Sequence, residues 1–273
     1  MALERMRVVV LVKAAPVLTQ NLDETMCVAG ARVDCDPPEW IRLHPVPFRD
    51  LATEVRFAKY QEVEVEVRRP KTDRRPESWS PRSDTIQPGP TMGTERAWAD
   101  RRVLVSRLLE ANMCDLVEAN RSGSGPGVPS LAVVRPAEPP VLVISARDDE
   151  QLDKWGRRAE GASARLSLFD DTATSKPDFE IVPWRFQYRY RCRADGCGTH
   201  EQTIVDWEAV TLWRRVRHRT DWQELMRDKF EKQMWRNRSS VLFVGNMEQR
   251  PWNFLVLGIF WPPDQGFQPR LDL

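Results

Sequence analysis

The 273-residue sequence contains few histidines and almost no net charge. Only His44, His200 and His218 are present, so acid–base catalysis by imidazole has few candidates. Lysine and arginine total 41 against 40 aspartates and glutamates, which gives a formal net charge of +1. The whole molecule is therefore not a polycation, and any attraction to nucleic acid has to come from local patches.

The sequence also lacks a long apolar run and a regular set of cysteines. The apolar stretch Val8–Val12 ends at Lys13, which is too short for a signal peptide core or a membrane span. We therefore predict a first β-strand there and no transmembrane segment. The five cysteines are odd in number, and only two are close together, so a disulfide framework is not indicated. These features predict a protein of the reducing cytosol.

Two catalytic signatures are missing as well. The stretch Ser122–Gly127 is rich in glycine, but it lacks the Lys-Ser/Thr ending and the preceding strand of a phosphate-binding loop. A Gly-x-Ser-x-Gly nucleophile elbow does not occur. Any chemistry therefore has to come from less common arrangements of residues.

The N-terminal region carries the clearest strand pattern. Three valines alternate with three glutamates in Tyr60–Arg68, which indicates a strand with one buried and one solvated face. Three further strands are predicted earlier, at Arg7–Val12, Thr25–Val33 and Trp40–His44. Arg68–Pro90 is rich in proline and arginine without periodicity, and we expect a surface loop or a mobile arm there.

The rest of the chain mixes helices and strands. Apolar residues at helical spacing predict one helix over Thr94–Ala119, with Cys114 near its apolar stripe as a small buried side chain. Arg121–Pro129 breaks regular structure. Further elements are expected as short strands and helices at Leu131–Val134, Val141–Ile144, Asp148–Gly161, Phe186–Arg193, Ile204–Arg217, Asp221–Trp235, Val241–Gly245 and Phe254–Phe260.

Two short motifs near the N-terminus resemble the opening of bacterial dual OB-fold-type domains. Those domains carry a Cys-hydrophobic-Ala-Gly strand followed by a Trp-Ile-Arg-Pro strand. Here Cys27–Gly30 and Trp40–Arg42 match, whereas Leu43 and His44 separate the arginine from the proline. The resemblance covers about the first 70 residues. It implies small β-barrels, a class that often binds oligonucleotides through a strand face and its loops.

Together these patterns predict an α+β protein. Small OB-like β-barrels are expected in the N-terminal half, and an α+β arrangement in the C-terminal half. As domains we predict an OB-like β domain with a terminal helix at residues 1–120, a linker or mobile loop at 121–130, and an α+β domain at 131–273.

The C-terminal half contains a compact Cys/His knuckle. Cys192, Cys197 and His200 fall within nine residues and supply three of the four ligands that a zinc site needs. A fourth ligand has no diagnostic spacing, and the candidates are Asp195, Asp206, His218 or a distant cysteine. Zinc is therefore the cofactor that the sequence suggests.

Three interpretations of the knuckle are open at this point. It can be a structural metal site, or a metal-free turn whose cysteines are reduced thiols. It can also be a catalytic metal site with water in the open position, in which case Glu201 or Glu208 would act as the base.

Asp206 and Glu208 flank Trp207 and form a pair of carboxylates. Such a pair can hold Mg²⁺ near a phosphate in a nuclease, often with a nearby lysine, but no Glu-x-Lys follows on an evident strand. Helix capping or ion pairing with the arginines of Arg214–Arg217 is the alternative interpretation.

Basic and aromatic residues alternate through Arg185–Arg193. Arginines neutralise phosphates and aromatic rings stack on bases, so the pattern suits nucleic acid. The alternative is a strand with an aromatic core face and a solvated arginine face. The nucleic-acid-binding candidates are Arg185, Tyr188, Arg189, Tyr190, Arg191, Arg214, Arg215 and Arg217.

From these observations we predict a cytoplasmic bacterial protein that binds DNA or RNA as a non-catalytic recognition subunit of a complex. One alternative is a metal-dependent nuclease built on the knuckle with Asp206 and Glu208. Another is a protein–protein adaptor, for which many exposed tryptophans among the eleven in the chain would be the sign.

Overall fold

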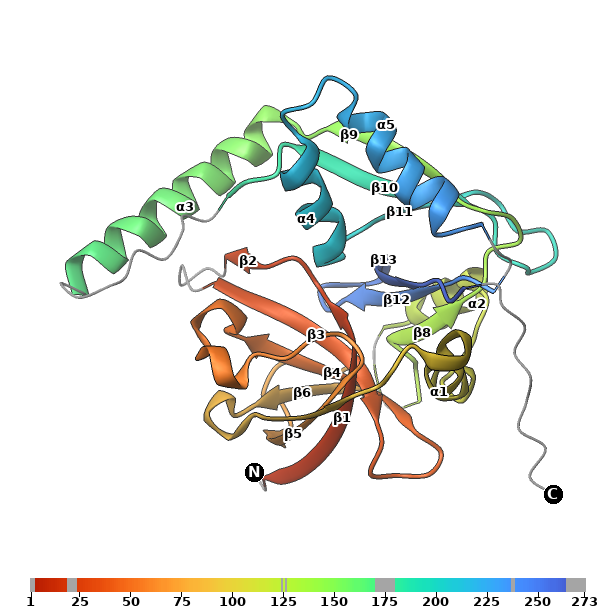
Figure 1. Cartoon of the computed structure of the whole chain (residues 1–273), viewed down its shortest axis with the longest axis horizontal. Coiled ribbons are helices and arrows are strands. Elements are labelled where there is room, and N and C mark those ends of the chain that lie inside the picture. Colours follow the sequence, from red (N-terminus) through yellow and green to blue (C-terminus); the bar gives the residue numbers. More distant parts are fainter. Residues whose placement is uncertain are drawn as a thin grey trace.

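The computed structural model describes residues 3–18, 24–123, 125, 127–169, 180–236 and 239–263, and only the backbone of 161–169. The protein is a mixed α+β structure, as predicted (Figure 1). The described strands form one sheet of seven strands in the N-terminal half and two sheets of three strands in the C-terminal half. Among the described helices, none is both long enough and apolar enough to cross a membrane.

The N-terminal half forms a closed five-stranded β-barrel. The strands pair in the order β1-β3-β4-β6-β5, and β5 returns to pair with β1. β4 and β6 are parallel, and the other neighbours are antiparallel. The barrel strands are β1 (Glu4–Lys13), β3 (Glu24–Arg32), β4 (Glu39–Val46), β5 (Gln61–Arg68) and β6 (Ser78–Pro81). Two more strands pair at its edges, β2 (Val17–Leu18) with β3 and β7 (Gln87–Thr91) with β5.

The apolar patterns of two strands follow from their positions in the barrel. The predicted alternation of β5 is confirmed, because Val63, Val65 and Val67 fill the barrel interior. The three glutamates that alternate with these valines, Glu62, Glu64 and Glu66, face outward and form ion pairs with Arg7, Arg5 and Arg82. β1 is apolar on both sides because Val8 faces the interior and Val9 packs against the C-terminal half.

The expectation of a loop or mobile arm at Arg68–Pro90 is wrong, because this segment contains β6 and β7. β6 closes the barrel between β4 and β5, and Trp79 on it is buried in the barrel interior. The strand is only four residues long and ends in proline, so it is too short to show periodicity. Its partner strands decide its structure, and they are remote in sequence.

The strands of the C-terminal half pair in two groups of three. β9 pairs with β10 and β10 with β11, while β13 pairs with β12 and β12 with β8. A parallel bridge between Ile204 and Val256 joins the two three-stranded sheets on one side, and the consecutive strands β8 and β9 join them on the other. These strands are β8 (Leu131–Val134), β9 (Val141–Ala146), β10 (Trp184–Tyr190), β11 (His200–Thr203), β12 (Val241–Met247) and β13 (Arg250–Phe260).

Helices cover the C-terminal strands and extend from them. The single helix expected at Thr94–Ala119 is instead two helices, because residues 109–111 leave the helical path to pair with Val133 of β8. The longest helix, α3, reaches outward from the body of the molecule (Figure 1). The α-helices are α1 (Glu95–Ser106), α2 (Met113–Arg121), α3 (Asp149–Phe169), α4 (Trp207–Val216) and α5 (Trp222–Arg227), which continues as a π-helix over Asp228–Gln233. Three short 3-10 helices lie at Phe48–Asp50, Thr53–Val55 and Ser83–Thr85.

The two halves share a hydrophobic core. The outward side chains of the barrel strands β1, β3 and β4 pack against β8, β12 and β13. Trp40 meets Phe243 edge-on, with ring centroids 5.6 Å apart, and Phe260 also packs here. The outer face of β3 and β4 is therefore buried inside the molecule.

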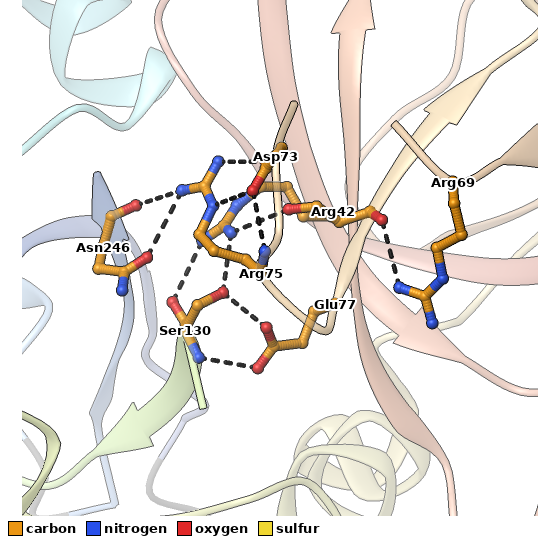
Figure 2. Close-up of polar contacts among 8 residues, drawn as sticks. Arg42, Arg69, Asp73, Arg75, Glu77, Ser130 and Asn246 are labelled. Atoms are coloured by element: carbon orange, nitrogen blue, oxygen red, sulfur yellow. Dashed lines mark hydrogen bonds and ion pairs between the residues drawn. The ribbon is translucent and has the colours of Figure 1, made fainter. Parts of the chain in front are cut away.

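A buried polar network crosses the same junction (Figure 2). Arg42 is 2% exposed and donates hydrogen bonds to the hydroxyl and carbonyl oxygens of Ser130, at 2.8 and 3.1 Å. Glu77 accepts from the backbone N–H and the hydroxyl of Ser130. Arg75 pairs with Asp73 and donates to the carbonyl oxygen of Asn246 at 2.7 Å. Each buried cation thus has partners that fix the two halves against each other.

The structure explains the residues of the two motifs that resemble dual OB-fold-type domains. A Cβ atom at Gly30 would lie 2.2 Å from the carbonyl oxygen of Val9, so only glycine allows β1 and β3 to approach as they do. In the second motif Ile41 points into the barrel, whereas Trp40 and Arg42 point outward to the C-terminal half. The Trp-Ile-Arg motif therefore serves the junction as well as the barrel.

The junction network predicts a large stability difference between two arginine substitutions. Arg42→Met would remove the guanidinium that donates to the hydroxyl and carbonyl oxygens of Ser130, and with it the buried positive charge near the Glu77 carboxylate. We expect a cost of about 3–5 kcal/mol. Arg82→Met removes an exposed arginine from its ion pairs with Glu66 and Asp84, and we expect a far smaller loss of stability because solvent screens these pairs. Urea unfolding of the two variants measures this difference. Equal losses in both variants would contradict the role given to Arg42.

Candidate functional site

The knuckle residues meet a fourth ligand in the fold. Cys192 and Cys197 lie in the loop between β10 and β11, and His200 begins β11. Cys114, in the first turn of α2, completes the group, and the four ligand atoms all lie within 4.8 Å of one another. Sγ of Cys192 is 3.3 Å from Sγ of Cys197 and 3.6 Å from Sγ of Cys114. Nε2 of His200 is 3.2 Å from Sγ of Cys197 and 3.4 Å from Sγ of Cys114.

Of the fourth ligands considered from the sequence, the distant cysteine is the one that the structure provides. Asp195, Asp206 and His218 are not part of the cluster. The interpretation of Cys114 as only a buried hydrophobic residue is incomplete, because its thiol faces the other three ligands. The sequence signal was its lone position on an apolar stripe, 78 residues before Cys192, and such a spacing identifies no site by itself.

The cluster has the size and composition of a closed metal site. Four tetrahedral ligands about 2.3 Å from a zinc ion would stand roughly 3.8 Å apart, close to the separations found here. All four positions are taken by protein side chains, and Cys192 and Cys197 are buried. Closed Cys₃His sets are typical of structural sites, whereas catalytic zinc keeps a position for water. The four residues can therefore hold one metal ion, which would link α2 to the β10–β11 loop.

The backbone of the loop brings these ligands together. Gly196 has a φ of 67°, a conformation that favours glycine, and the N–H of Cys197 donates to the carbonyl oxygen of Ala194. The guanidinium of Arg191 donates to the carbonyl oxygen of Cys197 at 3.0 Å. This hydrogen bond therefore connects Arg191, at the end of β10, to the loop that carries Cys192 and Cys197.

The thiols of the cluster differ in acidity. Burial acts to raise the pKa of Cys192, but hydrogen bonds from the backbone of Cys114 and Ala194 and from Cys197 and His200 outweigh it and lower the pKa to about 6. Burial and the hydrogen bonds with Cys197 and Cys192 raise the pKa of Cys114 to about 12. A bound metal has to displace the proton of Cys114, so metal affinity should increase with pH.

Asp206 and Glu208 form a different centre, between the barrel and α4. Asp206 is fully buried and caps α4 by accepting a hydrogen bond from the N–H of Glu208 at 2.9 Å. Both oxygens of Asp206 also accept from Nζ of Lys59, at 2.9 and 3.1 Å, and Glu208 pairs with the same amine at 3.2 Å. Helix capping and ion pairing are thus observed, but the partner is Lys59, just before β5, in place of the expected arginines.

Sequence reasoning missed the lysines of this centre because they are remote in the chain. Burial acts to lower the pKa of Lys59, but Asp206 and Glu208 outweigh it and hold the pKa above its usual value. Lys13 donates to the carbonyl oxygen of Phe57 and lies 3.9 Å from the centroid of the Phe48 ring. Burial, together with the charge of Lys59, lowers the pKa of Lys13 to about 8.

The predicted nucleic-acid-binding residues separate into distinct environments. Tyr188 and Tyr190 are buried, so their rings are not accessible for stacking with a base. The hydroxyl of Tyr188 donates to the carbonyl oxygen of Phe230, and that of Tyr190 donates to Oε1 of Gln202. Arg185, Arg189 and Arg191 lie on or beside β10, where alternate residues point away from the core. This matches the alternative interpretation of the pattern, an aromatic core face and a solvated arginine face.

The arginines of α4 are arranged differently from those of β10. Arg214 and Arg217 both pair with Glu180, and Arg215 is exposed. Part of their charge is therefore balanced within the protein. On the β10 face Arg189 pairs with Glu201 across the strands at 2.8 Å.

The metal cluster predicts a specific effect of one cysteine substitution. Cys114→Ser should reduce the metal content from about one ion per chain and lower the thermal unfolding midpoint by more than about 5 °C, because metal binding is coupled to folding. Cys35→Ser, outside the cluster, is the matched control and should change neither value. Elemental analysis and thermal melts check both. Full metal content in the Cys114 variant would refute the fourth ligand.

Lys13 predicts a pH-dependent stability. Its pKa falls from 10.5 to about 8 on folding, so between these values the unfolded chain binds a proton that the folded chain does not. The unfolding free energy of the protein, relative to that of Lys13→Met, should therefore increase as the pH rises from 8 to 10.5. Urea unfolding across this range measures the trend, with the exposed Lys71→Met as control. A flat or falling difference would contradict the burial of Lys13.

Comparison with family models places both halves in families defined by sequence. Residues 4–107 match the model described as a domain of unknown function (DUF8758). Residues 109–272 match the model described as a domain of unknown function (DUF8757). No curated protein matches the chain. Because the second match covers more than half of the 273 residues, the chain belongs to the family of the domain of unknown function DUF8757.

Proposed function

We propose that both halves of the chain are OB-type barrels. In the N-terminal barrel, three successive antiparallel strands are followed by a strand that pairs with β1 and by a last strand inserted parallel to β4. The C-terminal half has the same order if β8 and β9 count as one bent first strand, with Ile204 and Val256 as the parallel pair. Five-stranded Greek-key barrels of this kind carry ligands on the face of the second and third strands.

The proposed function is nucleic-acid binding without catalysis, through the outer face of β9, β10 and β11. The observation that carries this proposal is the row of arginines that point away from the core on β10 and directly after it, Arg185, Arg189 and Arg191. Thr203 and Glu201 on β11 lie on the same face, opposite Gln187 and Arg189. Guanidinium groups on such a face can make bidentate contacts with phosphates.

The N-terminal barrel has no open face at the equivalent position, and this supports the assignment to the C-terminal half. Its equivalent face, on β3 and β4, is covered by β8, β12 and β13. Trp40 and Arg42 on that face are buried. The proposed ligand face of the second barrel is open by comparison, since Arg189 and Glu201 are exposed. The first barrel then serves as a support for the second.

We propose zinc as the metal of the Cys114, Cys192, Cys197 and His200 cluster. Three thiolates and one imidazole favour zinc over the hard cations Mg²⁺ and Ca²⁺. Elemental analysis of the purified protein distinguishes zinc from iron or copper. The five cysteines are all free of disulfides, which fits the cytoplasmic location that we propose.

The two alternative functions have weaker support. A nuclease centre would need Asp206 and Glu208 to hold Mg²⁺, but both carboxylates are engaged by Lys59 and Asp206 is fully buried. An adaptor with many exposed tryptophans is not favoured either. All eleven tryptophans lie within the described residues, and Trp252 is the one that is exposed.

The β10 face predicts a salt-dependent affinity. Binding of a fluorescent single-stranded oligonucleotide, measured by anisotropy, should weaken steeply from about 50 to about 200 mM salt. Replacing Arg185, Arg189 and Arg191 together with glutamine should reduce the salt slope by about 2, because each lost phosphate contact contributes roughly 0.7. Arg5, Arg7 and Arg82, replaced in the same way, provide a control of equal charge on the opposite barrel.

A second variant tests the other candidate interface, at the arginines of α4. A triple glutamine variant of Arg214, Arg215 and Arg217 should bind nearly as well as the wild type. If this variant loses binding while the β10 variant keeps it, the interface is on α4 instead. Absence of binding by the wild type at low salt, or cleavage of the oligonucleotide, would reject the proposed function.

A further inference from the structure

A shallow depression lies where α3 begins, next to the proposed ligand face. It has a volume of about 330 Å³ and is lined by Asp148, Glu150, Gln151, Lys154, Trp155 and Arg158. Trp155 is only partly buried, so part of its indole ring remains accessible. The guanidinium carbon of Arg147 lies 4.6 Å from the ring centroid of Trp155, and this cation–π contact helps to fix the position of the ring.

The depression is continuous with the outer face of β10. Arg185, at the start of that strand, reaches Gln151 on α3, with 3.5 Å between Nη2 and Oε1. In the strand register Arg185 stands opposite Ser145, at the end of β9 just before α3. A chain that follows the arginines of β10 toward its start would therefore arrive at Trp155.

The groups around the depression combine three kinds of contact. Lys154, Arg158 and Arg185 supply positive charge for phosphates. Trp155 supplies an aromatic surface, and Gln151 supplies an amide that can both donate and accept hydrogen bonds. Asp148 is already engaged, because its carboxylate caps α3 by accepting from the N–H of Gln151 at 2.8 Å.

We propose that this depression receives an unpaired base of a single-stranded nucleic acid, which stacks on Trp155 while its flanking phosphates contact Lys154, Arg158 and Arg185. The inference rests on the proposed function of the β10 face and specifies its ligand as single-stranded. In a duplex the base faces are covered by their neighbours, so a stacking site selects strands whose bases are free.

The test compares two substitutions of Trp155 with one of Trp252. Trp155→Leu removes the stacking ring, Trp155→Phe keeps an aromatic ring, and Trp252→Leu removes an exposed tryptophan on β13. The probe is a fluorescent oligothymidine of about 15 nucleotides, and the readout is its dissociation constant at low salt. We expect Trp155→Leu to bind roughly 5- to 150-fold more weakly, and the other two variants to bind within about threefold of the wild type.

A second measurement uses the wild-type protein and does not depend on the folding of any variant. The same strand without bases keeps its phosphates, and a blunt duplex keeps its bases paired. Both should bind more weakly than the oligothymidine, and thymidine monophosphate should compete only at high concentration because it lacks the neighbouring phosphates. The abasic strand should also lose the difference between the wild type and Trp155→Leu.

The possible failures separate the two proposals. Equal binding of oligothymidine and abasic strand, or an unaffected Trp155→Leu variant, would overturn the stacking site and leave the β10 interface standing. Tighter binding of the duplex than of the single strand would overturn the single-stranded ligand. If the wild type bound none of these probes at low salt, the proposed function itself would fail, and the stacking site with it.

Discussion

The structure depends on the burial of one face of the N-terminal barrel against the C-terminal half. Arg42 lies in this contact with almost no exposure, and its guanidinium is satisfied by Ser130 from the other half. A buried cation without partners is costly, so the two halves have one favourable arrangement in which these hydrogen bonds form. The consequence for function is that the barrel face on β3 and β4 is occupied. The corresponding face of the C-terminal half, on β10 and β11, is the one for which we propose ligand binding.

The cysteine and histidine cluster and the arginine face belong to the same piece of structure. The cluster closes the loop at one end of β10 and β11 and fastens it to α2 through Cys114. Arg191 contacts this loop through the carbonyl oxygen of Cys197. At the other end of β10, Arg185 contacts the first turn of α3. The strand is therefore held at both ends. In the proposed function, such a rigid strand would present its arginines to phosphates with little loss of entropy on binding.

Short patterns in the sequence predicted the features that depend on neighbouring residues. The features that the sequence did not predict depend on tertiary contacts. The alternation of Val63, Val65 and Val67 identified β5, and the close spacing of Cys192, Cys197 and His200 identified three of the four residues of the cysteine and histidine cluster. Cys114 and Lys59 could not be identified, because they reach their sites through the packing of α2 and of the barrel. β6 was missed for the same reason, since four residues with a terminal proline become a strand only between β4 and β5.

Hydrogen–deuterium exchange of the whole protein with and without a single-stranded oligonucleotide tests the central claim most directly. If the C-terminal half binds the ligand as proposed, bound oligonucleotide should slow exchange in β9, β10 and the first turns of α3. Exchange in β3 and β4 should be slow in both states, because their outer face is buried against β8, β12 and β13. Protection that appears in the N-terminal barrel or along α4 and α5, with β9 and β10 unchanged, would contradict the account.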